Sequence, residues 1–587
     1  MINDFPPAAI LILGALLVPF FKGRAKSWYV ILLPAAAFYL ISKLDTGSSC
    51  QIHFFGFDLT LLRVDKLSKV FGYIFTLNAA AAFVYAFYLK NNTQHMAALF
   101  YIGSALGVVF AGDLVTLYFF WEIMAIASTF LILARKTDKA LRAGTRYVLL
   151  HIFGGLCLLA GIVIYISQTG SVGFEAMTQR TPATWLILIG ILINAAAPPM
   201  SAWLSDAYPE ATITGGVILS AYTTKTSVYA LIRGFAGWEI LIVIGCIMTL
   251  YGIIYALLEN DMRRILAYSI INQVGFMVAG VGIGTAMALN GAAAHAFCHI
   301  IYKSLLWMSA GSVLYMTGKS KCTELGGLYK TMPWTLFFGT IGALAISSFP
   351  GTSGFTSKSL IIDGAVHAHL VWVWIVLEIA SAGVFLHAGI KFPYFVFFAK
   401  DNGLRPGESH KSMLAAMGFL AFLCIFLGVY PKPLYAILPF AVDYQAYTLN
   451  HVVAQMQLLM LSALVFFLFL PLLKRTDTIS LDTDWFYRRG TQYLFGAMDR
   501  GLNGINHFCD RILARDLPAG IGWFFRKGPA RIATLIIIPM RAIMGDDKKA
   551  QNKIKVRIQS AFATDSYPVG ASAIAATLFI VMLFLFY

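Results

Sequence analysis

Titratable side chains lie inside stretches of this sequence that are otherwise apolar enough to cross a membrane. They are Glu122, Lys225, His295, His299, Lys303, Lys358 and Lys391. A charge in the bilayer core costs about 2.5–3.5 kcal/mol even on the mildest scale, so such residues are seldom kept for structure alone. Groups that take up and release protons at intervals through a membrane are what a path for protons or cations needs. The pattern therefore favours ion movement as the function.

Three of these residues follow one another at intervals of four. His295, His299 and Lys303 drift by only roughly 40° per step around a helix, so they share one face and rise roughly 12 Å along it. This stack favours a series of proton carriers joined by water. A metal site at the two histidines is the weaker alternative, because no carboxylate accompanies them and the lysine would repel a cation.

Glu122 and Lys225 each lie deep in an apolar stretch. Glu122 is either a protonated, neutral group or the partner of a cation; a glutamate hydrogen-bonded within a helix interface is the structural alternative. Hydroxyl side chains at 223–227 surround Lys225 and can hold water beside an amine that exchanges its proton. The alternative is a lysine that reaches the membrane surface, and the depth of Lys225 in its stretch argues against it.

Lys358 and Lys391 lie nearer to the interruptions or the ends of their apolar stretches. Lys358 follows Pro350-Gly351, and Lys391 stands one turn after His387, close enough to the end of its stretch to reach the membrane surface instead. Other charged residues stand at the ends of apolar stretches, where helix caps and entry funnels are equally good interpretations: Asp65, Asp113, Asp206, Asp261 and Arg264.

The composition is that of a helical membrane protein. Of 587 residues, 59% are hydrophobic and 12% are charged, against about 25% charged in soluble domains. Apolar runs of about 20 residues recur along the chain, which predicts an all-α polytopic protein with about 14–16 transmembrane helices. The net charge of +16 is typical of loops near anionic lipid, not of a nucleic-acid-binding protein. The cysteines show no disulfide or iron–sulfur spacing, and we expect neither a cofactor nor a bound metal.

The spans can be placed along the chain and oriented by their loops. We expect them at 6–21, 28–43, 66–89, 95–111, 114–134, 143–168, 183–205, 212–235, 237–258, 264–283, 288–316, 332–370, 372–398, 412–429, 453–473 and 566–587, the first being a span and not a signal peptide. Basic residues then gather in alternate loops, at 22–26, 135–146, 263–264, 319–330, 400–411 and 474–489. This predicts a bacterial-type inner membrane protein with these loops and the 475–565 segment in the cytoplasm and both termini outside.

Two spans contain prolines that interrupt a helix at membrane depth. The span at 183–205 contains Pro198-Pro199, and the span at 332–370 contains Pro350-Gly351. Proline removes a backbone donor, which is tolerated inside a membrane only where the freed groups face protein or water. Interrupted helices at matching places in two halves indicate the ion site of a transporter. A simple proline kink is the alternative for either helix alone.

Six strings occur in one order between about residues 60 and 430: GDLVTLYFFWE (112–122), WLSDAY (203–208), TKTSVYALIR (224–233), DMRRILAYSIINQVGF (261–276), HAFCHIIYK (295–303) and FPGTSGFTSK (349–358). The set resembles the antiporter-like proton-translocating subunits shared by respiratory complex I, membrane-bound hydrogenases and Mrp-type cation/proton antiporters. Within that family the chain looks most like the D subunit of the Mrp antiporters. The resemblance implies two inverted five-helix repeats, each with a broken helix, around a central hydrophilic axis.

The resemblance also implies roles for particular residues. Glu122 matches a glutamate near the subunit interface, Lys225 matches the lysine of the first half, His299 and Lys303 match the central relay, and Lys358 matches the lysine at the second broken helix. One departure concerns the first broken helix, where the family has a lysine and this chain has Asn194. That departure puts the usual glutamate–lysine pair of the first half in doubt.

The implied organisation has five parts: N-terminal peripheral helices at 1–94, a first half-channel at 95–235, a second at 236–400, C-terminal peripheral helices at 401–474, and a last segment at 475–587. In that last segment apolar residues alternate with arginine and aspartate, which predicts an interfacial amphipathic helix. It is similar to the lateral helix of the largest complex I antiporter-like subunit. A cytoplasmic tail resting on lipid is the alternative.

The sequence thus favours a proton- or cation-translocating subunit of a multi-subunit Mrp-type antiporter, moving protons and sodium or another monovalent cation beside other membrane subunits and lipid. A proton-pumping subunit of a redox-driven complex is the alternative. A stand-alone solute transporter lacks a polar cluster shaped for a solute. A quinone-reducing enzyme would need a redox centre that the sequence does not show, so we expect no enzyme. A scaffold would not need so many buried charges.

Overall fold

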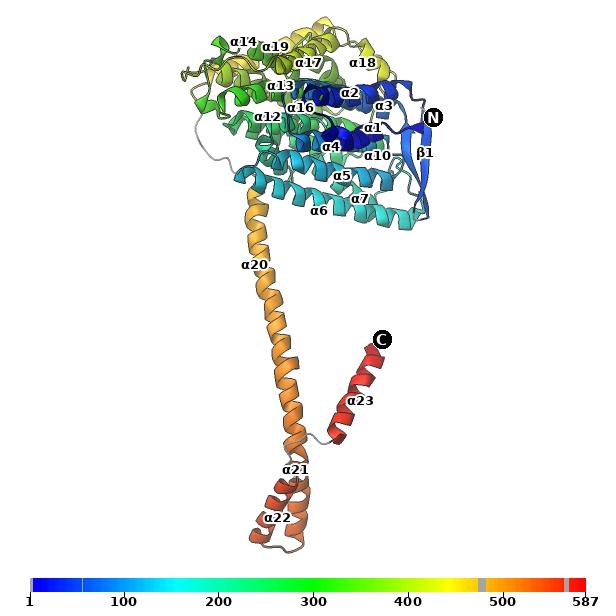
Figure 1. Cartoon of the computed structure of the whole chain (residues 1–587), viewed down its shortest axis with the longest axis vertical. Helices are drawn as coiled ribbons and strands as arrows, with labels where there is room; N and C mark the ends of the chain where they lie inside the picture. Colours follow the sequence, from blue (N-terminus) through cyan, green and yellow to red (C-terminus); the bar gives the residue numbers. More distant parts are fainter. Residues whose placement is uncertain (1–3, 55, 473–481, 564–568, 587) are drawn as a thin grey trace. The chain divides into compact units, whose positions relative to one another are not determined.

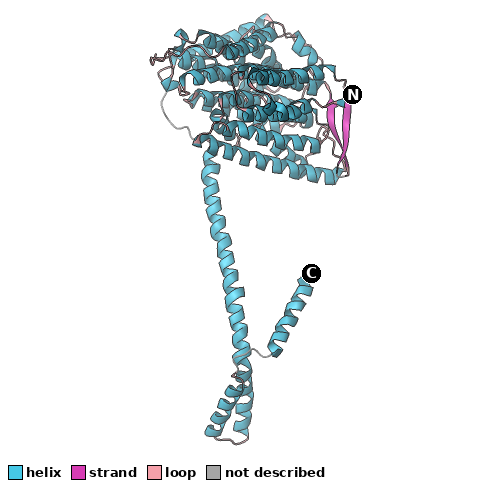
Figure 2. Ribbon diagram, viewed as in Figure 1, coloured by secondary structure: helices cyan, strands magenta, loops and turns pink. Residues whose placement is uncertain are grey.

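The computed structural model describes residues 4–54, 56–472, 482–563 and 569–586. The chain divides into a helical bundle, Met1–Asp484, and a C-terminal extension, Trp485–Tyr587. Figure 2 shows that most of the described chain is helical and that its strands form a single hairpin. The predicted all-α class is therefore confirmed.

Ten helices among the described residues are long and apolar enough to cross a membrane. They are α2 (Gly23–Lys43), α3 (Lys66–Tyr85), α4 (Asn92–Phe110), α5 (Leu114–Leu133), α6 (Asp138–Thr169), α11 (Ile240–Leu258), α12 (Met262–Ile283), α16 (Val371–Val384) with its π-helical continuation to Phe398, α17 (Lys411–Val429) and α19 (Leu449–Leu468). Shorter apolar helices include α1 (Pro7–Leu17), α7 (Pro182–Asn194) and α14 (Pro333–Ile346). The chain is a multi-pass membrane protein.

The hairpin was not predicted. Strand β1 (Gly47–Phe54) pairs antiparallel with β2 (Phe57–Val64), with Gly47 opposite Val64 and Phe54 opposite Phe57. It fills the connection between α2 and α3 (Figure 1). Leu62 and Val64 lie on one face of β2, and their buried side chains belong to the apolar core of the bundle, as expected for a strand with one covered face.

The same order of elements occurs twice in the bundle. The first half runs through α4, α5, α6, the broken helix α7 plus α8 (Ala202–Ala207), and a fifth helix made of α9 (Ile213–Leu219) and α10 (Thr223–Gly234). The second half runs through α11, α12, α13 (Ala286–Thr317), the broken helix α14 plus α15 (Ser353–His367), and α16 with the π-helix η6 (Phe385–Lys391). In each half the third helix packs against the broken helix.

The two helix breaks begin with the same turn. Ala196 and Ser348 stand at matching positions and both adopt the left-handed conformation, at φ 61° and 58°. The residue after each then closes the turn: Ala197 N donates to Leu192 O, and Phe349 N donates to Leu344 O, both at 3.0 Å. A left-handed residue other than glycine costs about 1–2 kcal/mol. Its recurrence in both halves shows that the fold itself specifies this geometry.

The centre of the bundle is formed by α12 and α13. The apolar window of α12 is completely buried, although its length and composition would suit a helix facing lipid. Most of α13 is buried as well. The bundle is completed by α18 (Lys432–Ile437) and by short helices η2 (Val18–Phe20), η3 (Tyr208–Glu210), η4 (Cys322–Glu324), η5 (Leu328–Lys330) and η7 (Tyr394–Phe398).

The extension, taken by itself, is helical. It contains α20 (Asp484–Cys509), η8 (Asp510–Asp516), α21 (Leu517–Ile543), α22 (Lys548–Ala561) and α23 (Val569–Phe586). On α20, Leu494, Met498, Leu502 and Ile505 are exposed, and their spacing puts them on one side of the helix. The amphipathic helix is therefore present, and its interfacial role stays a prediction.

Candidate ion path

The span expected as one helix at 212–235 is in fact interrupted, and Lys225 lies just after the interruption. Helix α9 ends at Leu219 and α10 begins at Thr223. The fully buried Lys225 Nζ donates to Ser220 O at 2.7 Å and to Thr224 Oγ1 at 3.1 Å. Hydroxyl side chains in such a run compete for backbone groups. The lysine therefore satisfies a carbonyl that the helix leaves free.

The stacked residues of α13 occupy the centre of the bundle, and all three are fully buried. His295 is held on both sides: its Nδ1 lies 3.1 Å from Ser357 Oγ, and its Nε2 lies 3.0 Å from Gln273 Oε1. In contrast, neither ring nitrogen of His299 nor Lys303 Nζ has a hydrogen-bond partner among the described residues. Buried polar atoms of this kind call for water or an ion, which suits the centre of a path.

The other two lysines also bind carbonyls at helix ends. Lys358 Nζ donates to Ile346 O at 3.1 Å, at the end of α14. Lys391 Nζ donates to the carbonyls that close α11, namely Ala256 O at 2.6 Å, Leu257 O at 2.9 Å and Glu259 O at 2.7 Å. Positive charge is favourable at a helix carboxyl end. Lys391 is fully buried and so does not reach the surface of the bundle.

Glu122 lies on α5 against α6, partly buried. Its Oε1 is buried and makes no hydrogen bond among the described residues. The same oxygen lies where a side chain on Gly155 would have to stand. Asn194, at the end of α7, is fully buried and both of its amide atoms lack partners in the described chain. The first half therefore holds a carboxylate and an amide where the family has a carboxylate and a lysine.

One titratable residue beside the candidate path was missed in the sequence. Glu378 lies on α16, partly buried, and lines a cavity of about 50 Å³ together with Lys358, Asp363, His451 and Gln455. Lys358 interacts electrostatically with Glu378. The signal was visible, because Glu378 is a single charge within an apolar run of α16, just as Glu122 is within α5.

The charged residues at span ends are caps and ion-pair partners. Asp65, Asp113 and Asp261 accept hydrogen bonds from backbone N–H groups in the first turns of α3, α5 and α12. Asp65 Oδ2 also lies 2.7 Å from Arg233 Nη2. Burial opposes ionisation of Asp65, but the Arg233 guanidinium prevails and holds the pKa of this carboxyl below its usual value.

Similarity to known proteins agrees with this arrangement. Residues 111–384 match the family described as NADH:quinone oxidoreductase/Mrp antiporter, TM. This segment of the chain is therefore similar to the antiporter-like membrane subunits. The matched segment holds every residue of the path described above except Lys391 and two cavity-lining residues, His451 and Gln455.

Two curated relatives come from Alkalihalophilus pseudofirmus. The A subunit of its Na(+)/H(+) antiporter is 27% identical over 482 residues, which are 71% of this chain and 60% of that protein. The D subunit is 29% identical over 361 residues, 57% of this chain and 72% of that protein. The expected likeness to the D subunit is thus joined by a likeness to the A subunit that extends over more of this chain. The chain spans less than two thirds of the length of that larger relative.

Two solved structures share the fold. A chain of the Mrp complex from Dietzia sp. DQ12-45-1b superposes with a TM-score of 0.75 at 20% identity, over 98% of this chain and 74% of that one. A chain of the membrane-bound sulfane sulfur reductase, an archaeal respiratory membrane complex, gives 0.71 at 22% identity, over 86% of this chain and 95% of that one.

Proposed function

We propose that this protein is a proton- and cation-translocating subunit of a multi-subunit Mrp-type antiporter, and that protons move along the buried titratable residues of the bundle. The observation that carries the proposal is the pair His299 and Lys303. Both are fully buried at the centre of the bundle, and both lack hydrogen-bond partners among the described residues. A structural role would leave these groups satisfied. A transport role requires groups that are free to bind and release protons.

The proposed path runs from the first half of the bundle through its centre to the second half. Glu122 and Lys225 belong to the first half, His299 and Lys303 lie between the halves, and Lys358 leads to the cavity lined by Glu378 in the second half. His295 connects the centre to the second break through Ser357. Lys391 holds the end of α11 beside this route. The proposed activity is ion transport, with no covalent bond made or broken.

Other membrane subunits are the proposed partners, and sodium or another monovalent cation is the proposed counter-ion. The named relatives are antiporter subunits, and a fold match comes from an Mrp complex. We place the chain in an inner membrane with its basic loops and the 475–565 segment on the cytoplasmic side. The exposed apolar side of α20 suits a brace along a neighbour or along lipid.

A second candidate is a proton-pumping subunit of a redox-driven complex. It is favoured by the fold match to a respiratory membrane complex, in which nearly the whole of that chain is covered. The proteins that co-purify in mild detergent distinguish the two. Other antiporter subunits support the first candidate, whereas subunits with redox centres support the second.

The proposed function is tested with Glu122→Gln and Lys225→Ala in membrane vesicles that contain the complete complex. We expect both to abolish cation-driven proton exchange while the complex still assembles, because the substitutions remove titration and little packing. Lys139→Ala is the control, since Lys139 is an exposed lysine in the first turn of α6. Normal exchange in the vesicles of either variant would show that the buried charges do not carry protons.

The dependence on partners has its own test. The purified single chain is reconstituted in liposomes and compared with the complete complex. We expect exchange only from the complex. Exchange by the single chain would remove the need for partners and leave the assignment of the buried residues intact.

A further inference from the structure

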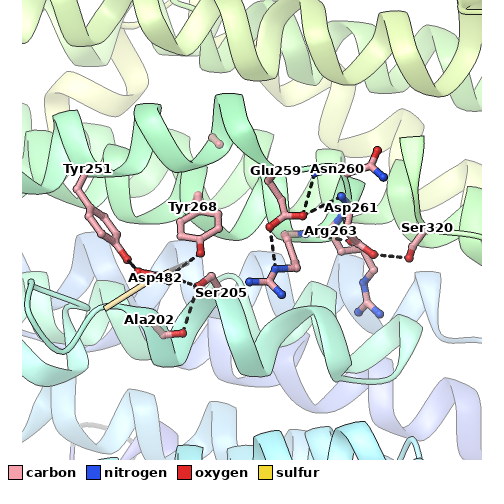
Figure 3. A network of polar contacts seen from close by, with 12 residues as sticks. Ala202, Ser205, Tyr251, Glu259, Asn260, Asp261, Arg263, Tyr268, Ser320 and Asp482 are labelled. Atoms are coloured by element: carbon pink, nitrogen blue, oxygen red, sulfur yellow. Dashed lines mark hydrogen bonds and ion pairs between the residues drawn. The ribbon is translucent and has the colours of Figure 1, made fainter. Parts of the chain in front are cut away.

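A buried carboxylate outside the path described so far lies at the break of the first half. Asp482, near the end of the bundle segment of the chain, is 6% exposed. Its oxygens accept hydrogen bonds from Tyr251 OH of α11, from Tyr268 OH of α12 at 2.5 Å, and from Ser205 Oγ of α8 at 3.3 Å. Figure 3 shows these three side chains converging on Asp482.

The partners of Asp482 differ in kind from those of other carboxylates in this region. Asp206 pairs with Arg146 at 2.7 Å, Glu259 pairs with Arg264 at 3.0 Å, and Glu210 pairs with Arg135 at 3.1 Å. Asp482 has no ion pair with any described residue. It is held by hydroxyl groups, that of its neighbour Thr483 included, and by the backbone N–H of Thr483. A carboxylate that served only as an anchor would be expected to have a cation, since burial of an unpaired charge is costly.

Hydroxyl partners allow the carboxyl group to gain and lose a proton where it stands. A tyrosine or serine hydroxyl both donates and accepts hydrogen bonds. It can donate to ionised Asp482, and after rotation it can accept from protonated Asp482. An arginine partner could not do this, because it has no acceptor.

Polar atoms without partners lie behind Asp482, at the same break. Ser201, one turn before Ser205, is fully buried and its Oγ makes no hydrogen bond among the described residues; it lies within reach of the Tyr251 hydroxyl. On the other side of the break, both amide atoms of Asn194 are buried and have no partner within the described chain. Such groups indicate water that bridges them.

The geometry points to Asp482 as a further proton-exchanging residue, which serves the first half at the end of its broken helix. This inference rests on the proposed function. Asp482 takes a proton from the aqueous side and passes it through the hydroxyls of Ser205 and Tyr251 toward Ser201. The first half, which has Asn194 in place of a lysine, thereby gains a titratable group from a distant part of the chain.

Charged and titratable groups near Asp482 also affect the pH dependence of exchange, and their effects must be told apart from that of Asp482. Tyr251 on α11 and Tyr268 on α12 contact Asp482 directly. The groups beside its partners are Tyr255 on α11, Arg264 on α12 with Glu259 paired to it, and Asp206 on α8 with Arg146 of α6 paired to it.

The test compares Asp482→Asn, Asp482→Glu and Tyr268→Phe in vesicles that contain the complete complex. The measurement is the rate of cation-driven proton exchange per assembled complex as a function of pH. We expect Asp482→Asn to lower the rate at least about tenfold and to change the pH profile. Asp482→Glu should keep the profile, and Tyr268→Phe should fall between. Asp499→Asn, an exposed aspartate on α20, is the matched control and should match the unmodified complex.

Two results would overturn the inference. One is an unchanged rate and pH profile in Asp482→Asn. The other is a reduced amount of assembled complex with an unchanged rate per complex, which would make Asp482 a structural anchor. Lys225→Ala, measured in parallel, separates this inference from the proposed function: if it still exchanges ions, the proposed function fails, and if it does not while Asp482→Asn is normal, only the inference fails.

Discussion

At matching positions after the two helix breaks, the first half carries Ser205 and Asp206, and the second half carries Ser357 and Lys358. Both breaks begin with the same turn, with a left-handed residue and a 3.0 Å hydrogen bond that closes it. The side chains make different connections. Ser357 meets His295 at the centre of the bundle, whereas Ser205 meets Asp482.

This difference separates what the fold provides from what the side chains provide. The break supplies free carbonyls and a polar gap within an apolar bundle. The residues placed after it decide whether that gap communicates with the centre, as Lys358 and His295 allow, or with the carboxylate of Asp482. The two halves are therefore expected to respond differently to equivalent substitutions.

The largest difference between the two halves is expected from the pair Lys358→Ala and Asp206→Asn. Lys358→Ala removes a titratable group from the path and should lower cation-driven proton exchange roughly 100-fold. Asp206→Asn weakens a partly exposed ion pair with Arg146 and should leave most of the exchange intact. The measurement is exchange in vesicles, normalised to assembled complex. Equal losses in the two variants would mean that the halves are functionally alike.

A smaller effect is expected from Gly155→Ala. A Cβ at this position would overlap the Glu122 carboxylate, so the carboxylate must move without being removed. We expect exchange to fall about tenfold at normal assembly. Gly407→Ala adds the same atom where nothing lies within 4 Å and serves as the control. If Gly155→Ala exchanges normally, the position of Glu122 is unimportant.

A still smaller effect is expected when the lysine of the family is introduced as Asn194→Lys. Both amide atoms of Asn194 lack partners among the described residues, which indicates water at this position. The variant should therefore reach the membrane in the usual amount and keep its exchange rate within about twofold. Loss of the variant from the membrane fraction would show that Asn194 is packed in a dry interface.

The smallest effect concerns the ion pair that joins Asp65 to Arg233 of α10. Asp65 has a lowered pKa in the folded state, so its stabilising effect is present above its unfolded pKa of about 3.9 and is lost as pH falls through the lower folded value. Asp65→Asn should lower the stability of the purified protein at neutral pH by about 1 kcal/mol or less, because the pair is partly exposed.

The measurement is thermal unfolding in detergent at several pH values. The difference between Asp65→Asn and the unmodified protein should shrink below about pH 4. A difference that stays constant down to low pH would show that the ion pair is not its cause.

Much of the fold could be predicted because membrane spans and proline breaks are local signals. Pro198-Pro199 and Pro350-Gly351 lie at the two interruptions, and the buried lysines stand out in apolar runs. The break before Lys225 has no proline to announce it. It arises from hydroxyl side chains that compete with the helix backbone, and a run of such residues is only a weak signal for a helix break.

The rest of the site depends on contacts between distant residues. Glu378 could have been identified as a charge in an apolar run. Asp482 could not, because nothing near it in sequence marks it as buried, and its partners Tyr251 and Tyr268 lie more than two hundred residues earlier. Only the folded bundle brings them together.

The central claim is that protons pass between the two halves at Lys303, and one measurement tests it most directly. The complete complex carrying Lys303→Ala is reconstituted in liposomes, and proton movement is followed after a cation gradient is imposed. Lys432→Ala, an exposed lysine outside the path, serves as the control. We predict no exchange from Lys303→Ala and normal exchange from Lys432→Ala, with equal assembly. Normal exchange from Lys303→Ala would contradict the claim.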